Sequence, residues 1–329
     1  MTMTRYLCRI TTALIFFGAL LGGQAAMAKD WPTQPMRIVL PYPPGGASDV
    51  TARLLGMKMS QAWGTTVVIE NRPGANGIVA NELVAKSPAD GYTVLMANLG
   101  PNAINPAVYG KLPYDTAKDF SPVILTTIVP LVIVTSSDSP IKNLAQLIVM
   151  AKEKPGQITF GSAGNGASNH LAGELLAAMT DVRMLHVPYK GDAPSITDVM
   201  GGQIAIALPT ALAGVPHIKN GKLRALAVTS QKRIASLPDV PTVDEALGIK
   251  GYEAVSWGGL MVPRGTPADV IAKINVEINK ALKTPDVAEK LTGLGAEIVG
   301  GTPEAFDTFL RAELIKWKKV AEGAKIRLD

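Results

Sequence analysis

Short apolar runs rich in β-branched residues alternate with amphipathic stretches along most of the chain. The runs predict strands at 36–41, 66–70, 93–97, 158–160, 184–187, 203–208 and 223–228. Between them, apolar residues recur at helical spacing, as at Val50, Leu54 and Met57. This alternation predicts parallel sheets with helices on both faces, which is the α/β class.

The last third of the chain is predicted to be helical. Thr266-Pro267-Ala268-Asp269 indicates a helix start with Thr266 as the N-cap and proline in the first turn. Thr302-Pro303-Glu304 repeats this signal before a terminal helix. Its apolar stripe, from Phe306 to Trp317, is typical of core packing.

Two apolar segments predict passages between two lobes. Residues 123–135 form a run too long for one ordinary strand, with Pro130 in its middle, and residues 255–263 form a second run. A chain that leaves one lobe, builds another and returns needs two such crossings. We therefore expect lobe I at 29–127 plus 252–329 and lobe II at 128–251.

The first 28 residues have the layout of a secretory signal peptide. Arg5 and Arg9 precede the uncharged run 13–21, and small residues at Ala26 and Ala28 follow. A membrane anchor needs roughly 20 apolar residues, and this run is shorter. We expect cleavage after Ala28 and a periplasmic protein.

Composition narrows the remaining classes. Cys8 is the only cysteine and precedes the expected cleavage site, so no disulfide or thiolate metal site is expected. The formal charge of +5 is spread along the chain without a Lys/Arg run, which argues against nucleic-acid binding. The three histidines show no metal-ligand spacing, and no catalytic or nucleotide-binding motif is present. We expect no cofactor, no metal and no enzyme. A hydrolase built on Ser162 and His170 is the enzymatic alternative.

Three glycine-rich turns, each between a predicted strand and a predicted helix, are candidates for binding. They are PYPPGGASD (41–49), GSAGNGASN (161–169) and VPYKGDAP (187–194). Glycines let the backbone approach a ligand, and the free N–H groups of a helix start favour an anion. Ligands of open α/β sheets bind beyond the carboxyl ends of the strands, where these turns lie. The alternative is ordinary loop chemistry, with Asp49 and Ser168 as helix caps.

These turns, together with blocks such as VIENRPGANG (68–77) and LPDVPTVDE (237–245), resemble the Bug family of solute receptors of tripartite tricarboxylate transporters. The resemblance covers essentially the whole chain after residue 28. It implies a two-lobed type II periplasmic-binding-protein fold, each lobe a sheet flanked by helices. It also implies closure around a small carboxylate, such as a di- or tricarboxylate, an amino acid or an aromatic acid, with a membrane permease as partner. We expect a monomer. The site residues that the resemblance implies are Pro44, Gly45, Gly46, Asp49, Ser162, Asn165, Gly166, Ser168, Tyr189, Lys190 and Gly191. Thr210 is a further candidate for ligand binding.

One departure from the family bears on the ligand. Many relatives carry a Phe-Asp pair after the strand that corresponds to 203–208, whereas this chain has Leu208-Pro209-Thr210 and no acid. The missing carboxylate favours a ligand without a free amine. The role of Trp257 stays open between stacking on a ligand ring and packing the hinge. A periplasmic sensory receptor for the same ligands is the alternative to a transport receptor.

Overall fold

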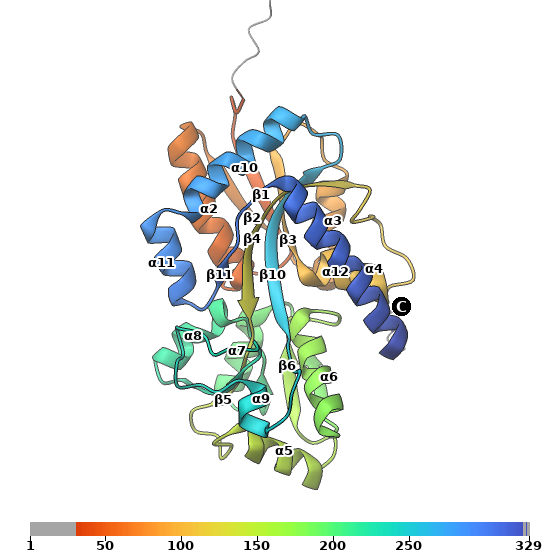
Figure 1. Cartoon of the computed structure of the whole chain (residues 1–329), viewed down its shortest axis with the longest axis vertical. Coiled ribbons are helices and arrows are strands. Elements are labelled where there is room, and N and C mark those ends of the chain that lie inside the picture. Colours follow the sequence, from red (N-terminus) through yellow and green to blue (C-terminus); the bar gives the residue numbers. More distant parts are fainter. Residues whose placement is uncertain (1–30, 325–326, 328–329) are drawn as a thin grey trace, which may run out of the picture. The chain divides into compact units, whose positions relative to one another are not determined.

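The computed structural model describes residues 31–324 and 327 of the chain. The residues from Gln34 onward form one compact unit, and it contains two β-sheets with helices around each (Figure 1). The expected signal peptide at 1–28 lies outside the described residues.

The strands are β1 (Met36–Leu40), β2 (Val67–Asn71), β3 (Thr93–Asn98), β4 (Phe120–Pro130), β5 (Val132–Ser136), β6 (Thr159–Ser162), β7 (Leu185–Pro188), β8 (Ile206–Ala207), β9 (Leu223–Val228), β10 (Val255–Pro263) and β11 (Glu297–Ile298). Seven of the strands overlap the seven predicted runs, β4, β5 and β10 cover the two apolar segments predicted as crossings, and β11 was not predicted.

Helices fill most of the connections. They are α2 (Ala47–Trp63), η1 (Ala75–Gly77), α3 (Ile78–Ala85), η2 (Gly100–Ile104), α4 (Asn105–Val108), α5 (Leu144–Glu153), α6 (Ser168–Thr180), α7 (Asp192–Met200), α8 (Ala211–Lys219), α9 (Val243–Leu247), α10 (Ala268–Leu282), α11 (Pro285–Gly293) and α12 (Pro303–Ala324).

Each lobe is built on one sheet. The first sheet has the order β11-β4-β10-β3-β1-β2, and the second has the order β7-β6-β8-β5-β9. The chain passes from the first sheet to the second between Pro130 and Val132, and it returns between β9 and β10. This arrangement confirms the two lobes and the two crossings. The residue bounds assigned to the lobes stay a prediction.

The sheets are mixed, so the expectation of parallel sheets is wrong in part. β1 pairs in parallel with β2 and β3, and β6 pairs in parallel with β7 and β8. In contrast, β10 is antiparallel to both of its neighbours, and so is β5. The crossings explain the difference, because β5 and β10 are the strands by which the chain enters a lobe directly from the other, and they run against the neighbouring strands.

Two local predictions are also wrong. Met57 is 45% exposed, whereas Leu55 and Met59 of the same helix are fully buried, so α2 turns a neighbouring stripe towards the sheet. α10 has Pro267 as its N-cap, because the N–H of Ile271 donates to the Pro267 carbonyl. The Thr266 hydroxyl instead donates to the Pro263 carbonyl at 2.8 Å, so it closes the preceding turn.

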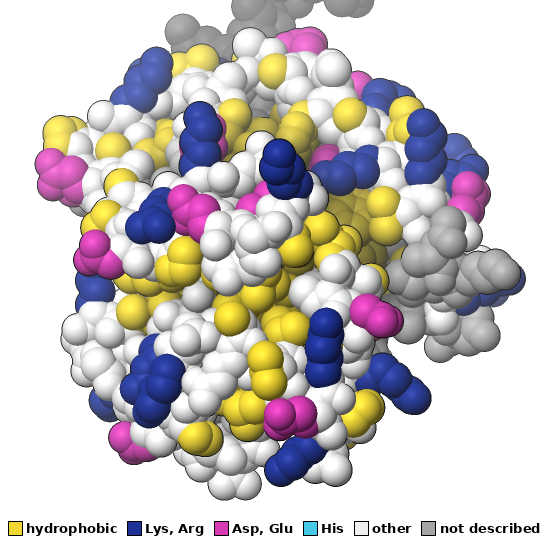
Figure 2. Space-filling model, turned by 60° about the horizontal axis from the view of Figure 1, so that its bottom comes forward, with side chains coloured by type: hydrophobic (Ala, Val, Ile, Leu, Met, Phe, Trp, Pro, Cys, Tyr) yellow, Lys and Arg dark blue, Asp and Glu magenta, His cyan; other side chains and the backbone are white. Residues whose placement is uncertain are grey.

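Charged side chains are interspersed on the visible surface. Figure 2 shows Lys and Arg scattered over this face with Asp and Glu between them, and apolar side chains in the hollows. No helix of the described residues is both long and apolar enough to cross a membrane.

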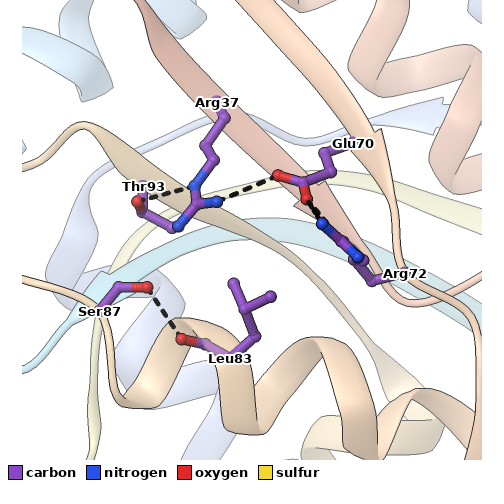
Figure 3. Close-up of polar contacts among 6 residues, drawn as sticks. All are labelled: Arg37, Glu70, Arg72, Leu83, Ser87 and Thr93. Atoms are coloured by element: carbon purple, nitrogen blue, oxygen red, sulfur yellow. Dashed lines mark hydrogen bonds and ion pairs between the residues drawn. The ribbon is translucent and has the colours of Figure 1, made fainter.

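The edge of the first sheet carries a charged network (Figure 3). Arg37 of β1 donates to the Thr93 hydroxyl of β3 at 3.1 Å and to the Glu70 carboxylate of β2 at 3.3 Å, and Arg72 also pairs with Glu70. Charges on an edge strand such as β2 oppose pairing with another chain. The same view shows the Ser87 hydroxyl closing the end of α3 on the Leu83 carbonyl.

Candidate functional site

The candidate site is a pocket in which four helix N-termini meet. Its lining comes from the starts of α2, α6, α7 and α8 and from β3, β10 and the loops beside them. The residues are Tyr42, Gly46, Ala47, Ser48, Asn98, Gly100, Ala163, Ala167, Ser168, Asn169, Asp192, Thr210 and Ser256. The space that they enclose, including the part open to solvent, is about 450 Å³.

The topology explains the convergence. β6 runs parallel to β7 and β8, so their carboxyl ends lie at one edge of the second sheet and the loops into α6, α7 and α8 leave from that edge. β1 supplies α2 from the other lobe. None of these four helices has a side-chain hydrogen bond at its N-cap. Their first N–H groups lack partners within the helix and carry partial positive charge, so the pocket favours an anion.

The wall of the pocket that lobe I forms is a chain of polar groups joined by hydrogen bonds. The Ser48 hydroxyl donates to the Asn98 side-chain oxygen at 2.9 Å, and the Asn98 amide donates to the Trp257 carbonyl at 3.4 Å. Asn102 holds the backbone N–H of Asn98 through its side-chain oxygen. These buried groups fix one face of the pocket before any ligand binds.

The lobe II wall centres on a buried carboxylate. Asp192 accepts hydrogen bonds from the Asn169 amide, at 2.9 Å, and from the Thr210 hydroxyl, at 2.7 Å. The Asn169 side-chain oxygen in turn accepts from the N–H of Ala163. Burial raises the pKa of Asp192, and the hydrogen bonds from Thr210 and Asn169 offset only part of this effect.

The two lobes meet at the mouth of the pocket. A Cβ atom on Gly191, the N-cap of α7, would lie 2.9 Å from the Cδ of Pro43, and one on Gly45 would lie 3.5 Å from the Cβ of Ala193. The β1–α2 loop and the start of α7 are therefore in van der Waals contact.

Tyr42 and Ala163 line this pocket and also a neighbouring pocket, which Tyr189 and Lys190 help to line. The Tyr42 hydroxyl donates to the Asn76 side-chain oxygen at 3.0 Å. Burial and the charge of Asp192 raise the pKa of Tyr42, so this hydroxyl stays protonated. Tyr189 donates to the Asp198 carboxylate at 2.7 Å, which turns its hydroxyl towards α7.

The predicted site residues therefore divide into groups. Gly46, Ser168 and Thr210 line the candidate pocket, Tyr189 and Lys190 line the neighbouring pocket, and Gly191 lies at the contact between the lobes. Pro44, Gly45 and Asn165 lie on exposed parts of the loops.

The hydrogen-bond partners of Asp49 all belong to lobe I. It accepts hydrogen bonds from Arg53 at 2.9 Å, from Asn71 at 3.2 Å and from the N–H of Gly45 at 3.1 Å. Burial alone raises the pKa of Asp49, but these hydrogen bonds outweigh it and the pKa is lowered. Asp49 thus folds the glycine-rich loop back onto α2.

Ser162 and Gly166 of the second glycine-rich loop (161–169) each contact a histidine side chain. The Ser162 hydroxyl is fully buried and lies 2.6 Å from His186 Nε2. Its histidine partner is therefore His186, and the pairing of Ser162 with His170 in the hydrolase alternative is wrong. The N–H of Gly166 donates to His170 Nδ1 at 3.1 Å. The two imidazole rings stack with centroids 3.9 Å apart. Burial lowers the pKa of His170 to about 4, and burial with the nearby His170 lowers that of His186 to about 3.

Trp257 packs the hinge. It is 2% exposed and meets the rings of Phe306 and Phe309 edge-on, with centroids 5.8 and 5.7 Å away. Its ring N–H donates to Glu313 of α12 at 3.1 Å. Of the two roles left open, the structure favours packing.

Several lining residues were not predicted, above all Asn98, Asn169, Asp192 and Ser256. Asn98 ends β3, and the rule that ligands lie beyond strand ends points to it. Ser256 lies within β10, and the sequence has no signal for it. Among the residues that the structure describes, no group of three His, Cys, Asp or Glu side chains is placed to hold a metal ion.

Two lobes on separate sheets, with helix N-termini from both turned on one pocket, define a solute-binding protein. A family model for the tripartite tricarboxylate transporter family receptor, TctC, matches residues 51–326, and the chain belongs to this family. The chain is 36% identical over 331 residues to protein BugT of Bordetella pertussis, covering 99% of this chain and 100% of that protein. The predicted family resemblance is confirmed.

Solved structures agree with the fold. The chain is similar to Rpa4515 of R. palustris with adipate, at 38% identity and a TM-score of 0.87, covering 91% of this chain and 99% of that one. It is also similar to MatC of Rhodopseudomonas palustris with bound malate, at 31% identity and a TM-score of 0.83, covering 88% and 99%. These relatives are binding proteins, and the predicted periplasmic-binding-protein fold is confirmed.

Proposed function

We propose that the protein captures a small carboxylate, a di- or tricarboxylate or an aromatic acid, between its two lobes in the periplasm and presents it to a membrane permease of the tripartite tricarboxylate type. The observation that carries this proposal is the convergence of the N-termini of α2, α6, α7 and α8 on one pocket. Each such N-terminus acts as about half a positive charge, and its N–H groups point at the ligand.

The relatives support the ligand class, because one is solved with adipate and another with malate. In this chain we place the ligand carboxylate between Gly46 and Ser168, whose helices belong to different lobes. Thr210 and the loop that carries Tyr189, Lys190 and Gly191 complete the proposed site. The other predicted loop residues act by shaping these loops, as the hydrogen bonds of Asp49 and Gly166 indicate.

The mechanism follows from contacts that span the lobes. A ligand that bridges the start of α2 and the start of α6 stabilises only the closed arrangement, so binding shifts the population towards closure. The hinge consists of the two crossings, at Leu131 and at the segment before β10. We assign the lobes as 29–127 plus 252–329 and 128–251 on the same basis.

A substitution that caps the N-terminus of α6 with an uncharged side chain tests the site. Ala167 is the N-cap residue of α6, lines the pocket and has extended backbone, with φ −71° and ψ 158°. In Ala167→Asn the new side chain accepts the N–H groups that the ligand would use. We expect thermal stability to hold or to rise by about 1 kcal/mol. Affinity for adipate, malate or phenylacetate, measured by calorimetry, should fall at least roughly tenfold, about 1.4 kcal/mol.

Pro267→Asn is the matched control. Pro267 is the N-cap of α10, which also lacks a side-chain cap and lies outside the pocket lining. This variant should bind as the wild type does. Wild-type affinity in Ala167→Asn would refute the assignment of the α6 N-terminus. If no small carboxylate binds the wild-type protein, the proposed function itself is wrong.

A further inference from the structure

Asp192 places a buried carboxyl group inside a pocket that is otherwise suited to an anion. It is 7% exposed and lines the pocket as the first residue of α7. Its Oδ2 accepts from the Thr210 hydroxyl at 2.7 Å and from the Thr210 N–H at 3.2 Å, and its Oδ1 accepts from Asn169 at 2.9 Å.

These three donors are neutral, and they leave one acceptor position of the carboxylate without a hydrogen bond. The charge interactions and hydrogen bonds that set the protonation of Asp192 include no Lys, Arg or His among the described residues. A carboxylate offers about four acceptor positions, two on each oxygen. Thr210 takes both positions on Oδ2, and Asn169 takes one on Oδ1. One acceptor position on Oδ1 is left, on a buried carboxyl group that has no cationic partner among these groups.

The anion-binding groups lie close to this carboxylate. A Cβ atom built on Gly46, at the start of α2, would lie 4.0 Å from Asp192 Oδ2. The free N–H groups of α2 and the Asp192 carboxylate therefore face the same small space. A ligand that brings a cationic group there can hold Asp192 in its ionised form, because opposite charges interact strongly in a buried setting.

We propose that the cleft selects a carboxylic acid that also carries a protonated amine, with Asp192 Oδ1 as the acceptor for the ammonium group. The ligand carboxylate then lies at the N-termini of α2 and α6, and the ammonium supplies the counterion that Asp192 lacks. A 2-amino acid holds the two groups one carbon apart, which matches the short separation between the α2 N-terminus and Asp192. This inference rests on the proposed function and refines its ligand.

The inference replaces an expectation from the sequence. The absence of an acid after 203–208 favoured a ligand without an amine, but the fold brings Asp192 of α7 against Thr210, which follows that strand. The carboxylate missing from one loop is supplied by another, so the premise of that expectation is wrong.

Ligands that differ in a single group show whether Asp192 selects the ligand or has only a structural role. Succinate, malate and aspartate share a four-carbon skeleton and carry hydrogen, hydroxyl or ammonium at the second carbon. Phenylacetate, mandelate and phenylglycine form the corresponding aromatic series. Calorimetry with the purified wild-type protein should show, in the series that binds, at least tenfold tighter binding of the amino member than of the unsubstituted one.

The Asp192→Asn variant should reduce this preference to less than threefold, because the amide keeps the shape and loses the charge. Asp138→Asn removes a charge at an exposed position outside the pocket lining and should keep the wild-type ratio. Thermal melting shows whether Asp192→Asn is folded. If it is not, the wild-type ratios alone decide, because a carboxylate that only braces α6, α7 and α8 gives no preference for the amine.

The inference is overturned if the unsubstituted or hydroxy member binds wild type as tightly as the amino member, or if folded Asp192→Asn keeps the preference. In both cases the protein still binds carboxylates and the proposed function stands. If no member of either series and none of the acids named above binds, the proposed function and the inference both fall.

Discussion

Closure of the lobes over the ligand is tested most directly at Gly191. This residue has φ +145°, and a Cβ atom there would lie 2.9 Å from Pro43 Cδ across the mouth of the pocket. In Gly191→Ala the methyl group forces the β1–α2 loop and the start of α7 apart. Overpacking of this kind costs roughly 1–3 kcal/mol. Since the contact exists only when the lobes are closed, the dissociation constant should rise by roughly 5- to 150-fold.

Calorimetry on the tightest ligand measures the effect, and two controls separate the clash from backbone strain. Gly202→Ala adds a methyl group at φ +70° with no atom within 4 Å, so it should bind normally. Adding Pro43→Ala to Gly191→Ala removes the atoms that clash and should restore most of the affinity. Wild-type affinity in Gly191→Ala, or no recovery in the double variant, would refute the argument that these loops must touch for binding.

Two further predictions concern stability. The pKa values of His170 and His186 lie below the ordinary value of 6.5 in the folded state, so below about pH 6.5 the unfolded chain takes up protons that the folded chain does not. The free energy of unfolding should therefore be highest above pH 6.5 and should decrease as the pH is lowered towards 5. His170 alone should account for a loss of about 1.4 kcal/mol at pH 5.5. If urea titrations give the same free energy of unfolding over this range, the assignment of the two pKa values is wrong. Trp257→Phe removes the hydrogen bond to Glu313 and should lower the free energy of unfolding by about 1 kcal/mol. Its ligand affinity should stay within about twofold, since Trp257 packs the hinge; a large loss of affinity would instead support stacking on the ligand.

Most strand positions were predictable because these strands are short apolar runs bounded by turn residues, whereas β11, with only Glu297 and Ile298, carries no such signal. The break at Pro130 was also predictable, and the structure indeed ends β4 there and starts β5 at Val132. The buried face of α2 was not predictable. Apolar residues occur on two neighbouring stripes of that helix, and only packing against Val67 and Ile69 of β2, beside Gly56, selects one of them.

The site was predictable in position but not in detail. Glycine-rich loops at strand ends are a local signal, and they led to Gly46, Ser168 and the α7 loop. Asp192 follows Gly191 and resembles an ordinary acidic residue in a first helical turn. Its role comes from contacts with Asn169 and Thr210, which are 23 and 18 residues away. No periodicity or motif connects residues so far apart.

Uncapped helix ends alone do not mark this site. α10 and α11 also lack side-chain caps and take no part in lining the pocket. By contrast, α5 is capped by the side chain of Asn143, and α9 by Thr242 and Glu245 in a capping box. The pocket is distinguished by four uncapped ends that share one small volume with a single buried carboxylate. In the function proposed above, such a cleft attracts a carboxylate through its backbone N–H groups, and Asp192 selects which carboxylate binds.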